Sequence, residues 1–264
     1  MISRCRLCDS QNLRLYYTEG NDDQFKYYKC LNCKLVNYDM SAGFDQEKHM
    51  KYFIDPRDNK HKTNTLQEQT YNFIKRYIAK PGKLLDIGCY NGRLLLAARK
   101  DGWEVGGLEL FSFLADSIKK TTGIDVKVCN FLEYEVIENE SYDLVVLRHV
   151  LEHLPDCILA MNKINSLLKS NGFAVLEFPN TDSLDLRFKW FLRRNDIYRR
   201  KFSPDYIPAH CNEFCKKSFE FLLAKTRFRL VEWQTYSSNE LLSPLYNIFK
   251  FGNKARAVIR KIHS

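Results

Sequence analysis

The sequence predicts an α/β protein, with a doubly wound, mostly parallel sheet and a small cysteine-rich module at its N-terminus. Three observations support this fold class. Short apolar runs alternate with stretches of helical periodicity through the middle of the chain, two pairs of cysteines stand near its start, and 264 residues allow one full-sized domain with a small appendage. Strands that alternate with helices form a parallel sheet with helices on both faces.

The composition is that of an ordinary globular protein. Hydrophobic residues make up 45% of the chain and charged residues 28%, which excludes disordered, collagen-like and disulfide-scaffold proteins. No apolar run approaches the roughly 18 residues of a membrane-spanning helix, which excludes an integral membrane protein. The first residues lack the apolar core of a secretory signal, so we expect a cytoplasmic protein whose nine cysteines are reduced.

The positive charge is concentrated near the C-terminus. Residues 187–264 contain 17 Lys and Arg against 6 Asp and Glu, whereas residues 1–186 contain 24 against 26. The formal net charge of +9 therefore belongs to the last third of the chain. A basic surface attracts phosphates, nucleic acid or an anionic membrane, so we expect an anionic partner there.

Four cysteines in the first part of the chain have the spacing of metal ligands. Cys5 and Cys8 form one CxxC pair and Cys30 and Cys33 form a second, with 21 residues between the pairs. Such pairs are typical of a tetrahedral zinc site, where four thiolates leave no open position for catalysis. We therefore predict a structural Zn²⁺ in a module at residues 1–40, which is too short to bury a core of its own. Free thiols or a redox pair are the alternative.

The predicted main domain covers residues 65–238 and follows a polar, turn-rich connector at 41–64. Its first helix is predicted at 65–79, where apolar residues recur at three- and four-residue spacing and Lys80-Pro81-Gly82 ends the pattern. Further helices are predicted at 93–100 and 111–121, and strands at 83–88, 104–109, 126–129, 142–147 and 172–178.

The turn after the first strand of this domain is a candidate ligand site. It has the sequence DIGCYNG (residues 86–92) and precedes a helix. Ligands of doubly wound sheets bind outside the carboxyl ends of the strands, and small residues there let the backbone approach a ligand closely. Glu109 ends the second strand 21 positions after Gly88, as expected of a carboxylate that binds ribose hydroxyls. The combination is typical of nucleotide binding.

These residues resemble the first two motifs of the class I S-adenosylmethionine-dependent methyltransferases. Asp86, Gly88 and Gly92 match the acidic residue and the outer glycines of the first motif, and Glu109 matches the acid that binds the ribose. Tyr90 replaces the middle glycine, so its side chain has to turn away from the cofactor. The resemblance implies a Rossmann-like fold and S-adenosylmethionine as the cofactor.

Further motifs narrow the resemblance. Residues 142–156 (YDLVVLRHVLEHLPD) resemble the fourth motif of one subfamily, which includes ubiquinone-pathway O-methyltransferases and sugar methyltransferases. Residues 177–180 and 218–228 also resemble the corresponding segments of that subfamily. Asn130 and Phe131 take the place where the family binds adenine, although Asp is more usual there than Asn. The cofactor-binding residues that the resemblance implies are Asp86, Gly88, Cys89, Tyr90, Asn91, Gly92, Glu109, Leu110, Asn130, Phe131 and Arg148.

Methyl transfer to a hydroxyl needs a base, because the acceptor loses a proton. His149 follows the fourth strand and is the first candidate; the alternative is that it contacts the cofactor's amino-acid end through its backbone only. Glu152 and His153 share the next turn. In the ubiquinone-pathway relatives an acidic motif here is thought to hold a divalent ion, with Glu in place of His149, so we do not expect a catalytic Mg²⁺.

His153 and His210 are the other catalytic candidates. The alternative for His153 is a hydrogen-bonded residue that steadies its loop. The resemblance places His210 near the acceptor, as a second candidate base. We interpret Cys211 and Cys215, which form a CxxxC pair, as packing residues.

A basic, aromatic insertion at residues 184–213 follows the last predicted strand. Seven Lys and Arg between positions 187 and 201 interleave with aromatic residues. The insertion either covers the acceptor, with arginines on phosphates and aromatic rings on sugar faces, or forms an amphipathic surface helix. Residues 239–264 are expected to form a basic amphipathic tail that either covers the sheet or contacts an anionic membrane. No final strand is recognisable in this tail.

The sequence therefore predicts an S-adenosylmethionine-dependent methyltransferase that acts on an anionic small molecule. We expect O-methylation of a sugar in a nucleotide-linked or cell-surface glycan. The sugar C-methyltransferases that the chain resembles also begin with a four-cysteine zinc module, but they carry a large C-terminal domain that this sequence lacks. Two alternatives are a ribosomal RNA guanine methyltransferase and a catalytically silent binding protein in which Tyr90 blocks the cofactor.

Overall fold

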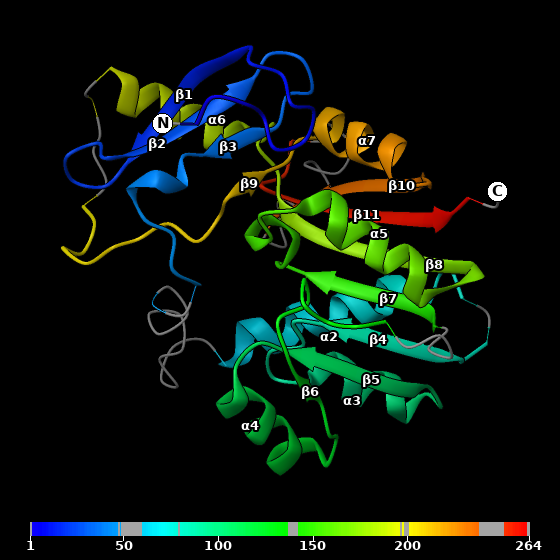
Figure 1. The fold of residues 1–264 in the computed structure, drawn as a ribbon. Helices are drawn as coiled ribbons and strands as arrows, with labels where there is room; N and C mark the ends of the chain where they lie inside the picture. Colours follow the sequence, from blue (N-terminus) through cyan, green and yellow to red (C-terminus); the bar gives the residue numbers. More distant parts are fainter. Residues whose placement is uncertain are drawn as a thin grey trace.

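The computed structural model describes residues 2–46, 48, 60–78, 80–136, 142–195, 197, 201–237 and 251–262. They form two sheets, one with four strands and one with seven. Figure 1 shows the four-stranded sheet, mostly blue, above the seven-stranded one.

The four-stranded sheet is antiparallel and has the order β1-β2-β3-β9. Its strands are β1 (Leu13–Glu19), β2 (Phe25–Cys30), β3 (Val36–Tyr38) and β9 (Asn212–Glu213). A short helix, η1 (Met40–Ala42), follows β3. Because β9 comes from the far end of the sequence, this sheet joins the N-terminal module to the main domain.

The seven-stranded sheet has the order β10-β11-β8-β7-β4-β5-β6. The strands from β4 to β8 are parallel, and β11 runs antiparallel to its neighbours β8 and β10. The strands are β4 (Lys83–Ile87), β5 (Glu104–Glu109), β6 (Lys127–Val128), β7 (Tyr142–Arg148), β8 (Leu168–Pro179), β10 (Phe228–Tyr236) and β11 (Lys254–Lys261).

Helices cover both faces of this sheet. They are α2 (Lys60–Ile74), α3 (Arg93–Lys100) and α4 (Ser112–Thr122) on one face and α5 (Cys157–Leu167) and α7 (Lys216–Lys225) on the other. The short helix η2 (Leu151–His153) lies in the loop after β7, and α6 (Leu184–Arg194) packs against the N-terminal module. Along β7, Leu144 and Val146 pack with the core that contains α2, α3 and α4, whereas Val145 and Leu147 pack with the core that contains α5 and α7. Alternation along a strand thus supplies both apolar layers, as the doubly wound prediction requires.

Most predicted elements of the main domain are confirmed, with two corrections. The first helix was expected at residues 65–79 but runs from Lys60 to Ile74, so it begins inside the predicted connector. It ends early, where the amide of Tyr77 bonds the carbonyl of Ile74 at 3.0 Å and tightens the chain into a turn.

The expected tail contains a strand that the sequence analysis missed. Residues 254–261 form β11 inside the sheet, between β8 and β10. The missed strand carries Arg256, which is buried in the structure. In the sequence this charged residue interrupts the apolar pattern that would otherwise indicate a strand. Residues 239–250 and 263–264 of the tail lie outside the described residues. Among the helices that the structure describes, none is long and apolar enough to span a membrane.

Candidate active site

The candidate site lies at the carboxyl ends of β4, β5 and β7, which are parallel neighbours. The chain proceeds from β4 to β5 and β6 on one side and returns to β7 and β8 on the other (Figure 1). Such a reversal is where doubly wound sheets bind ligands. The turn after β4, the end of β5 and the loop after β7 hold most of the predicted site residues.

The turn after β4 is built from three residues in the left-handed region. Gly88, Tyr90 and Gly92 have φ values of 71°, 53° and 67°. A Cβ on Gly88 would lie 2.4 Å from Cγ2 of Val150, and the corresponding atom on Gly92 would lie 2.7 Å from Cγ2 of Ile118. The glycines are therefore required by space as well as by conformation, whereas Tyr90 holds the same conformation at a steric cost.

Glu109 ties this turn to the end of β5. Its buried carboxylate accepts a hydrogen bond from the amide of Tyr90 at 2.9 Å and another from the amide of Leu110 at 2.8 Å. Burial raises the pKa of Glu109, against the lowering effect of these amide donors. The predicted ribose-binding acid thus also fixes the backbone of Tyr90.

Asp86 is the second acid of this region and is buried at the end of β4. Its Oδ1 has no hydrogen-bond partner among the described residues. Burial raises the pKa of Asp86 to about 7. A buried carboxyl oxygen without a donor is costly, and a ligand that donates to it removes this cost.

The other predicted cofactor residues play varied local roles. The side chain of Cys89 is buried, so only its backbone faces the turn. Asn91 Oδ1 accepts from the amide of Arg93 at 3.2 Å, at the start of α3. Leu110 is exposed just after β5.

Asn130 and Phe131 follow β6, as predicted. Asn130 Oδ1 accepts from the amide of Leu132 at 3.1 Å and thereby shapes its own turn. Phe131 is buried in the core. Their contact with an adenine stays a prediction.

Arg148, at the end of β7, belongs to a buried charged cluster. Its Nε donates to Glu177 at 2.9 Å, and Glu177 also accepts from Arg256, from Thr70 at 2.8 Å and from Tyr236 at 3.0 Å. Burial alone would raise the pKa of Glu177, but the two guanidinium groups bring it to about 2. The side chain of Arg148 is thus committed to Glu177, and its predicted cofactor contact stays untested.

His149 stands next to Glu152 in the loop after β7. Nδ1 of His149 lies 3.1 Å from Oε1 of Glu152, and the imidazole is about one-third exposed. Glu152 is fully buried. Burial would raise the pKa of Glu152, but the hydrogen bond from His149 and the nearby histidines lower it to about 2. An ionised carboxylate therefore orients the imidazole of His149, whose backbone has a strained φ of 55°.

Glu152, His153 and His210 form a compact group, which we call the histidine cluster. Each offers one atom, and these atoms lie within 4.8 Å of one another. His153 Nδ1 lies 2.9 Å from the carbonyl oxygen of Ala209, to which it donates. Two imidazoles and one carboxylate differ from the oxygen ligands that Mg²⁺ prefers, so we interpret the cluster as a group for acid–base chemistry.

The N-terminal module completes the surroundings of His210. Tyr17 on β1 donates to Glu213 Oε1 at 2.8 Å, and Glu213 Oε1 lies 3.9 Å from His210 Nδ1. Burial lowers the pKa of His210, but Glu213 and the other nearby acids outweigh burial and raise it. Sequence reasoning missed Tyr17 and Glu213. The sequence did hold a signal for Glu213, which stands three residues after His210, whereas Tyr17 lies in the separate N-terminal module and had none.

The four cysteines of the predicted zinc site come together. All four sulfur atoms lie within 4.8 Å of one another, with 3.5 Å between Cys5 and Cys33 and 3.5 Å between Cys8 and Cys30. Four thiolates around Zn²⁺ at about 2.3 Å stand roughly 3.8 Å apart, so the residues fit the ion.

The basic insertion forms α6 on the outside of the N-terminal module. Trp190 stacks on Tyr17 with ring centroids 4.9 Å apart, and Arg193 pairs with Asp23 at 2.6 Å. Phe188 and Phe191 are exposed. The surface-helix interpretation therefore describes α6, and an acceptor contact of the insertion stays a prediction. Tyr198, Arg199 and Arg200 lie outside the described residues.

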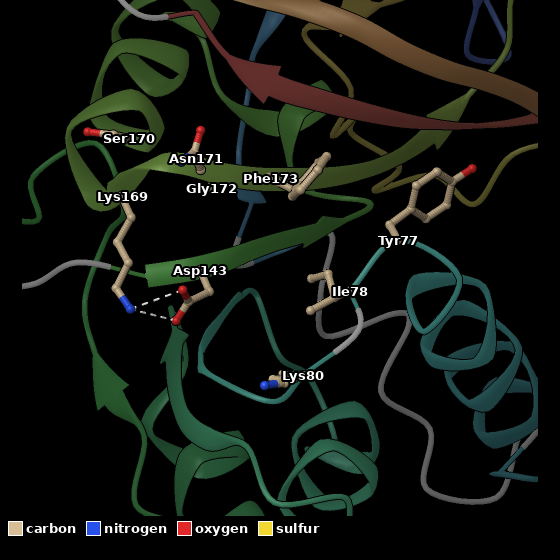
Figure 2. Close-up of a pocket in the computed structure, with 9 residues that line it drawn as sticks. All are labelled: Tyr77, Ile78, Lys80, Asp143, Lys169, Ser170, Asn171, Gly172 and Phe173. Atoms are coloured by element: carbon tan, nitrogen blue, oxygen red, sulfur yellow. Dashed lines mark hydrogen bonds and ion pairs between the residues drawn. The ribbon is translucent and has the colours of Figure 1, made fainter.

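A hollow of about 670 Å³ lies elsewhere on the molecule (Figure 2). Its lining includes Asp143 and Lys169, whose side chains form an ion pair at 2.8 Å. These residues stand near the amino ends of β7 and β8, at the opposite edge of the sheet from the turn after β4. The hollow contains none of the predicted site residues.

Comparison with known proteins was made for the whole chain. The model of the family described as "Methyltransferase domain" matches residues 46–232. A ubiquinone biosynthesis O-methyltransferase from Xanthomonas campestris is 28% identical over 115 residues, which cover 41% of this chain and 48% of that protein. The chain thus spans about half the length of the curated relatives it matches.

Solved structures share the fold. A protein from Pyrococcus horikoshii is similar with a TM-score of 0.59 at 15% identity, over 80% of this chain and 98% of that one. A SAM dependent methyltransferase from Archaeoglobus fulgidus is similar with a TM-score of 0.54 at 21% identity, over 74% of this chain and 94% of that one.

Proposed function

Because the chain belongs to the methyltransferase-domain family, we propose that it transfers a methyl group from S-adenosylmethionine to a hydroxyl group. The acceptor we propose is a sugar in a nucleotide-linked or cell-surface glycan. The observation that carries the proposal is the contact between His149 Nδ1 and Glu152 Oε1 at 3.1 Å, beside a turn shaped for a nucleoside.

The turn after β4 fits the cofactor. Gly88 and Gly92 give the turn its left-handed shape, in which a Cβ would clash with Val150 or Ile118. The unpartnered Oδ1 of buried Asp86 suits the cofactor's ammonium group. Glu109 would accept from the ribose hydroxyls, as the family resemblance implies. When bound, S-adenosylmethionine supplies an electrophilic methyl carbon.

His149 serves as the general base in this proposal. The ionised Glu152 accepts the Nδ1 proton of His149, which leaves Nε2 with its lone pair, free to take the proton of the acceptor hydroxyl. Orienting an imidazole in this way fixes its tautomer. His210 and His153 lie around the same Glu152 and would face the acceptor, with His210 as the second candidate base.

Two observations support a phosphorylated or acidic acceptor. The last third of the chain carries most of the positive charge, and His210 is held in a form that favours its cationic state. The curated relatives are named for O-methylation, which supports a hydroxyl acceptor. Their named pathway also makes a quinol precursor of ubiquinone the second candidate acceptor.

Transfer of labelled methyl groups tests this proposal. The zinc-loaded chain would receive methyl-labelled S-adenosylmethionine together with nucleotide sugars, a catechol-type quinol precursor or ribosomal RNA. We expect label in the sugar fraction. Label confined to the quinol would select the second candidate, and label confined to RNA would refute both. Calorimetry that detects no binding of S-adenosylmethionine would leave the silent binding protein.

A further inference from the structure

Arg6 connects the N-terminal module to the candidate active site. It lies between the two cysteines of the first CxxC pair, and its guanidinium reaches β3 and β9. Nε donates to Asn212 Oδ1 at 3.0 Å, Nη1 donates to the carbonyl of Tyr38 at 3.0 Å, and Nη2 donates to the carbonyl of Cys211. Three nitrogens of one side chain therefore hold two strands in register.

The acceptors of Arg6 adjoin the histidine cluster. Cys211 directly follows His210, and its amide donates to the carbonyl of Glu152 at 2.9 Å. Asn212 Nδ2 donates to the carbonyl of Leu154 at 2.7 Å. These two bonds span the loop that carries His153, so the place of β9 sets the place of the whole cluster.

The other end of this connection is the zinc site. The backbone amide of Arg6 donates to Asn37 Oδ1 at 3.0 Å, and Asn37 Nδ2 lies 3.6 Å from the sulfur of Cys5. Asn37 is fully buried on β3. The conformation of the first CxxC pair thus fixes the backbone from which the Arg6 side chain extends.

We propose that Arg6 is a positioning residue that uses the zinc-ordered CxxC pair to place His210 and Glu152 for the reaction. The kinetic part of this inference rests on the proposed function. Guanidinium is suited to the task because its planar fork presents several fixed donors. A lysine has one nitrogen on a flexible stem and does not reproduce three bonds in three directions.

The test compares three variants of the full zinc-loaded chain. Arg6→Met keeps the apolar stem, Arg6→Lys keeps the charge, and Arg4→Met is the matched control, because Arg4 pairs with Asp9 on the surface of the same module. We measure zinc content, affinity for S-adenosylmethionine, turnover, and the NMR resonances of the His153 and His210 imidazoles, assigned by His→Gln variants.

We expect both Arg6 variants to retain zinc and cofactor affinity, to shift the imidazole resonances and to lower kcat about 10- to 100-fold. Arg4→Met should match the wild type in every readout. Wild-type resonances and turnover in Arg6→Met would overturn the proposal, and so would full recovery in Arg6→Lys.

A second variant covers the case in which Arg6→Met loses zinc. Asn212→Ser removes both the bond from Arg6 and the bond to the carbonyl of Leu154, without altering the CxxC pair. Because both bonds belong to the connection from Arg6 to the loop of His153, the same resonance shifts are expected, and their absence would overturn the proposal. The resonances require no methyl acceptor. A chain that transfers no methyl group would therefore refute the proposed function, while the resonances still decide the role of Arg6.

Discussion

Tyr90 stands where the first motif of class I methyltransferases has its middle glycine, and it has a left-handed backbone that glycine adopts more easily than tyrosine. Its φ of 53° is left-handed, which costs a residue with a Cβ roughly 1 kcal/mol. The amide of Tyr90 bonds Glu109 at 2.9 Å, so the turn keeps its shape in spite of the side chain. The departure from the motif is therefore accommodated by the backbone.

A pair of variants measures this strain. Tyr90→Gly and Tyr90→Ala both remove the ring, but only glycine accepts positive φ without a steric cost. We expect Tyr90→Gly to exceed Tyr90→Ala by about 1 kcal/mol in free energy of unfolding, measured by urea denaturation. Equal stabilities would show that the turn relaxes to another conformation.

His149 and Glu152 are expected to act as one unit in catalysis. His149→Ala should lower kcat about 10²- to 10⁴-fold, and Glu152→Gln should lower it as well, because an amide does not stabilise the imidazolium that forms. The affinity for S-adenosylmethionine, measured by calorimetry, should change little in either variant. Full turnover in His149→Ala would remove His149 as the base.

The pH profile separates the two candidate bases. The pKa of His210 is raised, chiefly by Glu213 against the effect of burial, and a base acts only above its own pKa. If His210 were the base, Glu213→Gln would lower its pKa and move the acidic limb of kcat/KM to lower pH. With His149 as the base, we expect the limb to stay in place. Tyr17→Phe is the control, since it removes the hydroxyl that bonds Glu213 but keeps the Glu213 carboxyl group beside His210.

At the scale of elements, regular periodicity decided what could be predicted. The helix α3 (Arg93–Lys100) and the strand β5 (Glu104–Glu109) have the predicted bounds, because each is a short segment between clear turn signals. The strand β11 was missed because Arg256 interrupts its apolar pattern. Tertiary partners make that arginine acceptable inside the sheet: it donates to Glu177, 79 positions away in sequence, and to Thr70.

The candidate site, like the fold, could be predicted only in part from the sequence. Local motifs predicted the turn after β4, Glu109 and His149, whose neighbours are close in sequence. Glu213 stands only three positions after His210, but Tyr17, which binds Glu213, is 196 positions away from it in sequence. No spacing rule connects two such residues.

Glu177 joins β8 to β7, to β11 and to α2, and its ionisation should matter for stability. Its folded-state pKa of about 2 is below the usual value near 4.3 for an unfolded chain. Its contribution is therefore present above about pH 4.3 and is lost as the pH falls towards 2.

Glu177→Gln tests this contribution. Removing one partner of a buried ion pair costs roughly 3–5 kcal/mol, so we expect a loss of that order at pH 7 in urea denaturation. The variant should also lose less stability than the wild type between pH 4.5 and pH 2. An unchanged pH dependence would contradict the assigned role of Glu177.

At the scale of the whole molecule, the four-stranded and the seven-stranded sheet both contribute residues to the candidate site and its surroundings. The N-terminal module supplies Arg6, Tyr17 and the strand partner of β9, while the β4–β5 side of the large sheet supplies the predicted cofactor site. We expect the first side to depend on zinc for its fold, whereas the second has its own core between α2, α3 and the sheet. Zinc should therefore control the acceptor side of the site more than the cofactor side.

Chelation of zinc tests this division. Structural zinc contributes on the order of 10–16 kcal/mol to the folding of small modules, so its removal should unfold the N-terminal sheet. Trp190, stacked on Tyr17, would report the change by fluorescence, and Trp190→Phe would identify its share of the signal. We expect methyl transfer to be lost while S-adenosylmethionine still binds, because the turn after β4 packs on α3 and α4.

Added zinc should restore both the fluorescence and the activity. Loss of cofactor binding together with activity would show that the main domain needs the module to fold, and retained activity would show that the histidine cluster is held without it.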